Sequence, residues 1–543
     1  MFLQSLAFLA MQVTLSAAIP LDGPTVQLDN ANFTGVNLGQ ISKFLGIPFA
    51  QPPTGDLRFR LPQPNPPYMG ALTATSFGPS CPQQDLKLPI LEGLAANAVN
   101  YLANTLISAV FPDSEDCLTI NILKPASVTP TSKLPIVAWI YGGGFEFGGT
   151  SMYDGSVIVD HSIAIGSPII YVSMNYRVTG FGFLASKEVK DEGIGNLGLQ
   201  DQREALRWIQ KYIGAFGGDP TKVTIWGESA GAVSVSLQML ANDGDTQGLF
   251  RAAFMQSGSP VPVGDITNGQ IYYDALVSQT GCSDSSDTLA CLRTVPYKVL
   301  KAAINQSPSL FSYQSLVLAW LPRADGVFLS DNPQRLVQQG KVADIPFITG
   351  DCDDEGTAFS LSTLNITTEN EWKTYVKDIV LRGVPDVNLN KLASLYPQDI
   401  TQGSPYDTGI LNALTPQFKR MASFLGDVVF QAPRRFFLEQ HSSKQKTWAF
   451  LSKRLKVLPG LGSAHGTDIL NIYGGGELTD YLVRFVTNLD PNGGSNLKWP
   501  TYTTSSPKLL TFLDGVEPQV ITMDTYRREA IAFVTNISLA HPI

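Results

Sequence analysis

The chain has 543 residues, of which 44% are hydrophobic and 16% are charged, and its formal net charge is −9. This composition excludes a disordered chain, because it supplies enough apolar side chains for a large core. It also argues against nucleic acid as a partner, because no cluster of Lys and Arg is present to bind phosphates.

Residues 1–18 are predicted to form a signal peptide. The run from Leu3 to Leu15 is mostly apolar but too short to span a bilayer, and the small residues Ser16, Ala17 and Ala18 suit a cleavage site. No later segment is apolar over a spanning length. The remaining residues, 19–543, are expected to form a secreted, extracellular protein with a single α/β domain that carries insertions.

Cysteines and sequons are both compatible with an oxidising, extracellular compartment. Pairing of sequence neighbours would give Cys81–Cys117 and Cys282–Cys291 and leave Cys352 unpaired, although spacing alone does not determine the connectivity. Four asparagines lie in sequons and are candidates for glycosylation: Asn32, Asn305, Asn365 and Asn536.

The segment between Cys81 and Cys117 is long for a surface loop and carries no charge from residue 93 to residue 111. Its apolar residues recur at helical spacing and gather near one face: Leu94, Val99, Leu102, Leu106 and Val110. A helix with this pattern is compatible with a place in the core. The alternative is a lid whose apolar face docks on a lipid surface when the lid opens.

Six short apolar runs predict buried parallel strands, at residues 135–141, 168–174, 223–226, 252–255, 345–349 and 447–451. Residues 199–215 predict an amphipathic helix that ends at the turn 216–220, with one face formed by Leu206, Ile209, Tyr212 and Ile213. This alternation indicates an α/β fold with a large, mostly parallel central sheet and helices on both faces. The less regular stretch 260–440 is expected to add a helical layer over the sheet edge.

The strand at 223–226 runs directly into Gly227-Glu228-Ser229-Ala230-Gly231, and residues 230–240 predict a helix. A sharp strand-to-helix turn would expose the serine hydroxyl at the carboxyl end of the sheet, and the two glycines would leave room for that turn. The bare pattern also arises by chance in glycine-rich turns, but its position between a strand and a helix favours a nucleophile. Ser229 is therefore predicted to attack a carbonyl carbon.

Backbone N–H groups near this serine would stabilise the oxyanion formed by the attack. The residue after the nucleophile, Ala230, is one expected donor. A second source is Tyr141-Gly142-Gly143-Gly144-Phe145, directly after the 135–141 strand, because glycines let the backbone come close to a substrate oxygen. The alternative is a plain flexible loop, which the position after a buried strand disfavours.

A serine nucleophile requires a histidine base, and the chain has four histidines: His161, His441, His465 and His541. The expected chain order is Ser, acid, His, which excludes His161. His541 is close to the end of the chain, where fraying disfavours exact placement. His441 lies in a polar run, whereas His465 lies in a loop beyond the 447–451 strand and is favoured over His441.

The acid is expected in the loop after the 345–349 strand. Four carboxylates crowd this loop: Asp351, Asp353, Asp354 and Glu355. Spacing does not choose between them, and a solvated acidic turn that caps the next helix is the alternative interpretation.

Two segments closely resemble motifs of the cholinesterase-like type-B carboxylesterase family of α/β-hydrolases, namely residues 216–231 and 115–125. Within that family the chain is most similar to the secreted yeast lipases of the Candida rugosa type, through residues 46–50, 57–59, 175–177, 403–405, 408–420 and 489–491. The resemblance runs from about residue 22 to the C-terminus. It implies an α/β-hydrolase fold with a disulfide-bounded lid at about residues 81–117.

The resemblance also assigns the site residue by residue. It implies Ser229 as nucleophile, Glu355 as acid and His465 as base. The oxyanion donors that it implies are the N–H groups of Gly143, Gly144 and Ala230.

Further structural features follow from the same resemblance. It implies the disulfides Cys81–Cys117 and Cys282–Cys291, an ion pair between Arg58 and Glu115 near the base of the lid, and an apolar acyl tunnel lined by Val233 and Phe359. Cys352 departs from the family pattern. A buried, inert thiol is expected there, and a thiol that reacts with mercurials is the alternative.

The function implied by the resemblance is that of a secreted triacylglycerol lipase. It would hydrolyse long-chain carboxylic esters through a Ser-His-Glu acyl-enzyme mechanism, without a metal or a cofactor. Its expected partners are a lipid ester and the lipid–water interface, with the chain as a monomer or weak dimer. A sterol esterase or a carboxylesterase for soluble esters is the alternative. A non-catalytic binding protein of the same fold is more remote, because Ser229, Glu355 and His465 are all present.

Overall fold

The computed structural model describes residues 23–85 and 112–543. The predicted signal peptide, residues 1–18, and the uncharged part of the predicted lid, residues 93–111, lie outside the described residues. Within the two described ranges, no helix combines the length and the hydropathy needed to cross a membrane.

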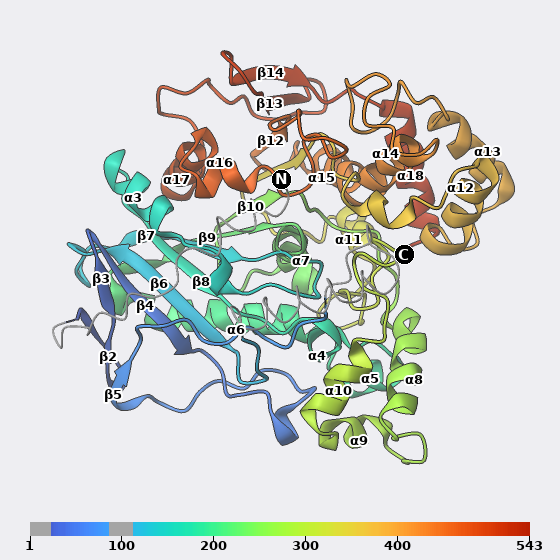
Figure 1. The fold of residues 1–543 in the computed structure, drawn as a ribbon. Helices are drawn as coiled ribbons and strands as arrows, with labels where there is room; N and C mark the ends of the chain where they lie inside the picture. Colours follow the sequence, from blue (N-terminus) through green and yellow to red (C-terminus); the bar gives the residue numbers. More distant parts are fainter. Residues whose placement is uncertain (1–22, 86–111) are drawn as a thin grey trace.

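One large sheet, built from eleven strands of the described residues, forms the centre of the molecule (Figure 1). Seven consecutive strands, from β8 to β13 in space, run parallel, and the strands at both edges pair antiparallel. The spatial order is β14 (Gln519–Met523), β13 (Lys508–Phe512), β12 (Thr447–Ser452), β11 (Phe347–Cys352), β10 (Ala252–Gln256), β9 (Gly218–Glu228), β7 (Leu134–Ile140), β8 (Ile170–Met174), β6 (Thr119–Pro125), β4 (Ile41–Pro48) and β3 (Val36–Leu38). A smaller sheet contains β1 (Thr25–Leu28), β2 (Asn30–Thr34) and β5 (Met69–Thr73).

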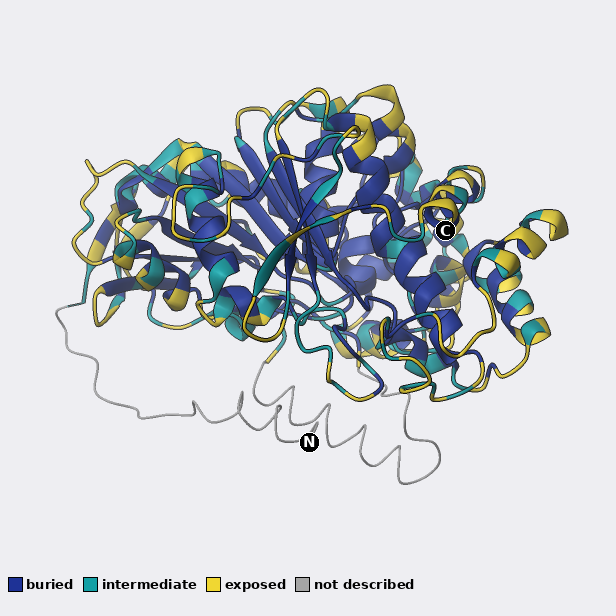
Figure 2. Ribbon diagram, turned by 90° about the horizontal axis from the view of Figure 1, so that it is seen from above, coloured by how far each residue is buried: buried dark blue, intermediate teal, exposed yellow. Residues whose placement is uncertain are grey.

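The six predicted strands are present as β7 to β12, which confirms the mostly parallel sheet. Apart from the polar start of β9, these strands are almost entirely buried (Figure 2), because helices cover both faces, and so each contains a short apolar run. β6 was not predicted, because Asn121 and Lys124 interrupt its apolar run although both are buried. The edge strand β14 was missed because its residues are half-buried or exposed.

Helices pack on both faces of the sheet, as predicted (Figure 1). α3 (Ser156–Ala164) and α17 (Glu477–Asn488) pack on one face, whereas α6 (Leu197–Tyr212) and α7 (Ala230–Gly244) pack on the other. The other α-helices of the described residues are α4 (Thr179–Phe183), α5 (Lys187–Glu192), α8 (Gln270–Gln279), α9 (Thr288–Thr294), α10 (Tyr297–Ile304), α11 (Pro333–Gln339), α12 (Glu369–Tyr375), α13 (Asp386–Leu395), α14 (Phe418–Gly426), α15 (Ala432–His441), α16 (Ile469–Tyr473) and α18 (Arg528–Ala540).

The regular structure in the stretch 260–440 is mostly helical, as expected, and the sheet strand β11 lies within it. Together with α18, the helices α12, α13 and α14 enclose a second apolar core that contains Trp372, Phe424 and Val534. The predicted helix at 199–215 is α6 followed by a short 3₁₀ helix, Ile213–Phe216, which ends at the left-handed Gly217.

The four candidate glycosylation sites differ in exposure. Asn32, Asn365 and Asn536 are exposed, whereas Asn305 is half-buried and its Oδ1 accepts a hydrogen bond of 3.1 Å from Asp85 N–H. Three of the four side chains are therefore accessible, and glycosylation stays a prediction.

The turn between β9 and α7 depends on one unusual backbone conformation. Ser229 has φ 57° and ψ −128°, a region that costs a residue with a side chain about 1–3 kcal/mol. Gly231 lets this turn lie directly against β7, because a Cβ at this position would overlap the carbonyl group of Ile140. Regular helical geometry then continues to Leu240, the predicted end of the helix, since Ala241 has left the helical conformation.

We expect Gly231→Ala to lower the free energy of unfolding by about 1–3 kcal/mol, because the new methyl group overlaps backbone atoms that have little room to move. Gly214→Ala is the matched control, since its Cβ would meet no atom within 4 Å. Differential scanning fluorimetry of the two variants tests the expectation. Equal melting temperatures would contradict it.

Candidate active site

Ser229, His465 and Glu355 come from three loops that meet at the carboxyl edge of the sheet. Ser229 follows β9, Glu355 follows β11, and His465 lies in the loop after β12. The Ser229 hydroxyl donates to His465 Nε2 over 2.7 Å, and His465 Nδ1–H donates to Glu355 Oε2 over 2.5 Å. In this geometry the imidazole can take the serine proton, and the carboxylate can stabilise the imidazolium that results.

Asp351 lies in β11 and the other three candidate carboxylates lie in the loop after it, and all four have polar partners. Glu355 is the one that faces His465, and only 1% of its surface is exposed. The others are engaged elsewhere: Asp351 with Arg434 (2.8 Å), Asp353 with Lys456 (2.6 Å) and Asp354 with the N–H of Ser463 (2.8 Å). Sequence spacing does not show which of these four groups faces His465, whereas their contacts in the structure do.

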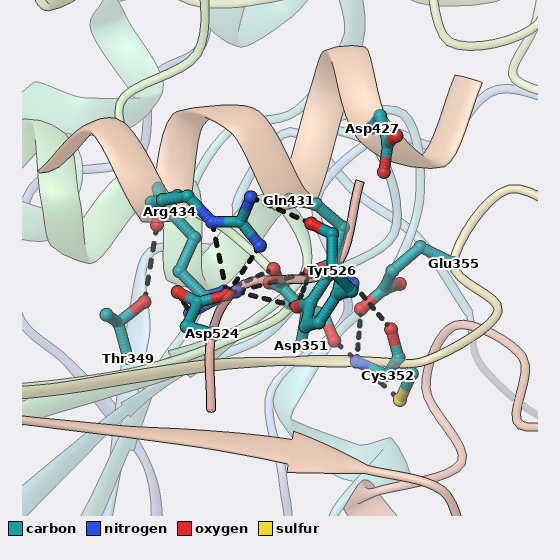
Figure 3. A network of polar contacts seen from close by, with 12 residues as sticks. Thr349, Asp351, Cys352, Glu355, Asp427, Gln431, Arg434, Asp524 and Tyr526 are labelled. Carbon is teal, nitrogen blue, oxygen red and sulfur yellow. Dashed lines mark hydrogen bonds and ion pairs between the residues drawn. The ribbon is translucent and has the colours of Figure 1, made fainter. Parts of the chain in front are cut away.

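Glu355 is also supported from behind by a buried polar network (Figure 3). Its Oε1 accepts a hydrogen bond of 2.6 Å from Cys352 N–H, and Cys352 O accepts one of 2.9 Å from Gln431 Nε2. Gln431 Oε1 in turn accepts a hydrogen bond from Tyr526 (2.6 Å). Arg434 completes the network through ion pairs with two buried aspartates. Such second-layer contacts fix the end of β11 and, with it, the position of the carboxylate.

The loop of His465 is joined to the loop of Glu355 through Asp354. The N–H of Asp354 donates to Ser463 O over 3.0 Å, and its carboxylate accepts from Ser463 N–H. The other histidines lie elsewhere: His441 Nε2 is 3.2 Å from Val337 O, His161 Nε2 is 3.6 Å from Asp480, and His541 follows α18. The sequence preference for His465 over His441 therefore agrees with the geometry.

Two further buried carboxyl groups surround His465, and the sequence interpretation assigned them no role. Glu228 Oε1 is 3.5 Å from His465 Nε2, and burial raises the pKa of Glu228 to about 8. Burial likewise raises the pKa of Asp468 to about 6, and this side chain accepts a hydrogen bond of 2.9 Å from Gln256. A charged residue at the end of an apolar strand was the one signal in the sequence that could have marked Glu228.

The charge state of His465 depends on these neighbours. Burial lowers the pKa of His465, but the Glu355 carboxylate outweighs burial and raises this pKa to about 9. The rings of Phe359 and Phe430 pack 5.1 and 4.7 Å from the imidazole and keep water from it. The surroundings of His465 therefore favour the imidazolium that forms when the serine proton is transferred.

The glycine loop after β7 lies beside Ser229, where an oxyanion would form. Gly143 and Gly144 have φ values of 105° and 63°, which glycine adopts without strain. A Cβ on Gly142 would lie 2.8 Å from Ser229 Cβ, so the loop and the serine are in close contact. In the described part of the chain, the N–H groups of Gly143, Gly144 and Ala230 make no hydrogen bond and so remain available to a substrate oxygen.

A cavity of about 300 Å³ opens at the Ser229 hydroxyl. Its walls are mostly apolar. They include Val233 and Phe359, which are both predicted to line an acyl tunnel. Other lining residues come from distant parts of the chain: Val263, Leu310, Leu318 and Phe430. This size and lining suit an apolar acyl chain with a single polar group at the serine.

The disulfides and the ion pair that the sequence predicts are present in the structure. Both disulfides, Cys81–Cys117 and Cys282–Cys291, are present. Arg58 and Glu115 form a two-pronged ion pair with N–O distances of 2.6 and 2.7 Å. Cys352 is unpaired and buried, and burial raises the pKa of its thiol, which disfavours the reactive thiolate.

Known proteins are similar to this chain over nearly its whole length. The model of the carboxylesterase family matches residues 22–534. The chain belongs to the carboxylesterase family. Its α/β-hydrolase fold and its class, that of the carboxylic ester hydrolases, follow from this membership together with the sheet and the helices described above.

Individual members of the carboxylesterase family show the same extent of similarity. Lipase 4 of Diutina rugosa is 45% identical, with 92% of each chain covered. Secreted lipase 1 of Botryotinia fuckeliana is 44% identical, with 90% of this chain and 88% of that protein covered. The crystal structure of Aspergillus niger EstA superposes with a TM-score of 0.81 at 27% identity, covering 96% of this chain and 99% of that one.

We expect Glu355→Gln to lower kcat by roughly 10³–10⁴-fold and to shift the acid limb of the pH profile to lower pH. A general base at His465 must be neutral to accept the serine proton, so kcat/KM is expected to rise as the pH rises through the pKa of His465. The Glu355 carboxylate raises this pKa, and an uncharged side chain removes that effect. The measurement is kcat/KM on a soluble ester between about pH 5 and pH 10.

Asp353→Asn is the matched control, because Asp353 lies in the same loop but pairs with Lys456 instead of His465. It should leave the acid limb in place. A Glu355→Gln variant with the acid limb of the wild type would rule out electrostatic support of His465 by Glu355.

Proposed function

We propose that the chain is a secreted lipase that hydrolyses triacylglycerols with long acyl chains, with Ser229, His465 and Glu355 as its catalytic residues. The observation that carries this proposal is the hydrogen-bonded line from Ser229 through His465 to Glu355, which ends at an apolar cavity of about 300 Å³. The names of the relatives, several of which are secreted lipases, support the substrate class and the extracellular location.

The reaction begins when Ser229 attacks the ester carbonyl and His465 takes the serine proton. The N–H groups of Gly143, Gly144 and Ala230 stabilise the oxyanion, at about 3–4 kcal/mol for each well-placed donor. His465 then protonates the leaving alcohol, and an acyl-enzyme remains on Ser229. A water molecule, deprotonated by His465, releases the fatty acid and restores the serine.

The segment between Cys81 and Cys117 is proposed to act as a lid at the lipid–water interface. Its uncharged sequence from residue 93 to residue 111 supports this role, and its stem is anchored by a disulfide and by the adjacent pair of Arg58 and Glu115. Residues 19–543 are proposed to form a single domain, as a monomer or weak dimer. A non-catalytic binding protein of this fold would not require the aligned proton path of Ser229.

Replacement of the nucleophile tests the reaction class. Ser229→Ala should abolish turnover of a p-nitrophenyl ester and labelling by a fluorophosphonate probe, because both depend on the Ser229 oxygen. Ser443→Ala is the control, since Ser443 is an exposed residue. If Ser229→Ala folds and still shows the rate of the wild type, the acyl-enzyme mechanism is wrong.

A substrate comparison tests the lipase assignment against its alternatives. Dispersed triolein should be hydrolysed faster than a soluble short ester, with a rise in rate above interfacial saturation, because the cavity is apolar. A preference for cholesteryl oleate would identify a sterol esterase. A preference for soluble esters, without the rise at the interface, would identify a general carboxylesterase.

A further inference from the structure

Glu146 is a buried carboxyl group in the glycine loop, two residues after Gly144, and it has no part in the proton transfers at Ser229. Only 1% of its surface is exposed. Its Oε2 accepts a hydrogen bond of 2.7 Å from Leu310 N–H, and its Oε1 has no hydrogen-bond partner among the described residues. A carboxyl group is costly to bury in this way, and its retention inside the loop calls for a role.

The Leu310 side chain connects this hydrogen bond to the oxyanion donors. A Cβ on Gly144 would lie 3.2 Å from Leu310 Cδ2, so the leucine rests directly on the Gly144 backbone. Leu310 also lines the cavity at Ser229. Glu146 holds the Leu310 backbone, and Leu310 in turn covers the peptide whose N–H is offered to the substrate oxygen.

The stem that follows Cys81 joins the same junction. Gln84 N–H donates to Glu146 O over 2.9 Å, and Gln84 Nε2 donates to Ser307 O over 3.0 Å. Gln83 forms two hydrogen bonds with the backbone of Gly148, at 3.1 and 3.3 Å. Three segments that are distant in sequence therefore meet at Glu146. The glycine loop is held by the stem after Cys81 and by the segment that contains Leu310.

Among the described residues of this junction, no cationic side chain faces Glu146. In the three segments of this junction, residues 82–85, 142–148 and 305–312, the one other titratable side chain is the exposed Asp85. Burial raises the pKa of Glu146 to about 8, and the Leu310 N–H opposes this rise. Glu146 is therefore neutral at pH 7, and it gains a negative charge beside the oxyanion donors as the pH rises above about 8.

We propose that Glu146 is a positioning residue that holds Leu310 against Gly144 and thereby fixes the N–H groups of Gly143 and Gly144 for the oxyanion. This inference rests on the proposed function, because it concerns the same reaction. As a consequence, the charge state of Glu146 also affects the turnover rate. An ionised Glu146 repels the oxyanion and weakens its stabilisation, although Ser229 and His465 are unchanged.

Two substitutions separate position from charge. Glu146→Leu removes the acceptor for Leu310 N–H and should lower kcat on a soluble ester about 10-fold at pH 7 with KM changed less than about 3-fold, a smaller effect than the 10²–10³-fold cost of deleting a donor. Glu146→Gln keeps an acceptor and cannot ionise. It should keep kcat within about 3-fold of the wild type at pH 7, and its kcat should rise relative to that of the wild type as the pH rises through about 8, because only the wild type gains the charge.

A trifluoromethyl ketone inhibitor provides an independent readout, because its adduct with Ser229 carries an oxyanion. Its affinity should fall for Glu146→Leu in proportion to kcat, whereas a merely structural role would lower the melting temperature alone.

A folded Glu146→Leu variant with the kcat and inhibitor affinity of the wild type would overturn the proposal. So would a Glu146→Gln variant whose kcat keeps the same ratio to that of the wild type below and above pH 8, which keeps the test decisive if Glu146→Leu fails to fold. An inactive wild type would overturn the proposed function as well, whereas an active wild type with unaffected variants would overturn this inference alone.

Discussion

The backbone of Ser229 is held in a conformation that its neighbours must maintain, and the rest of the site is arranged around this constraint. Gly231 lies against Ile140 of β7, and Ser229 N–H donates over 2.9 Å to Gln256 O at the end of β10. Three parallel strands thus hold one residue from two sides. Strain of about 1–3 kcal/mol persists only where such packing is rigid, and rigidity keeps the hydroxyl aimed at a fixed point.

A fixed Ser229 hydroxyl also requires a fixed position of His465, its proposed base. Buried polar contacts hold His465 in that position. Glu355 faces the imidazole because the backbone of Cys352 and the side chain of Gln431 hold the end of β11. Asp354 ties the histidine loop to the same strand. Each of these groups is buried, so loss of one partner would leave an unpaired polar atom, and the network therefore resists small displacements.

The core strands and the strand-turn-helix segment at Ser229 could be predicted from the sequence because both depend on local patterns. Each of β7 to β12 contains a short apolar run, and Ser229 lies between a strand and a helix. The acid could not be chosen locally, since the partners of Asp351, Asp353 and Asp354 are distant in sequence, and only the family resemblance pointed to Glu355. Glu228, beside His465, was missed because its neighbour in space lies more than two hundred residues away in the chain.

The two halves of the site differ in how they are held, and this difference bears on substrate selection. The Ser–His–Glu side rests on sheet strands, whereas the cavity wall and the glycine loop rest on loops joined through Glu146, Leu310 and the stem after Cys81. Loops adjust at a lower energetic cost than strands of a central sheet. We therefore expect a change of acyl chain or alcohol to be accommodated on the loop side, where Leu310 touches both the cavity and Gly144, a proposed oxyanion donor. Substrate shape can in this way affect transition-state stabilisation without any change in the geometry of Ser229, His465 and Glu355.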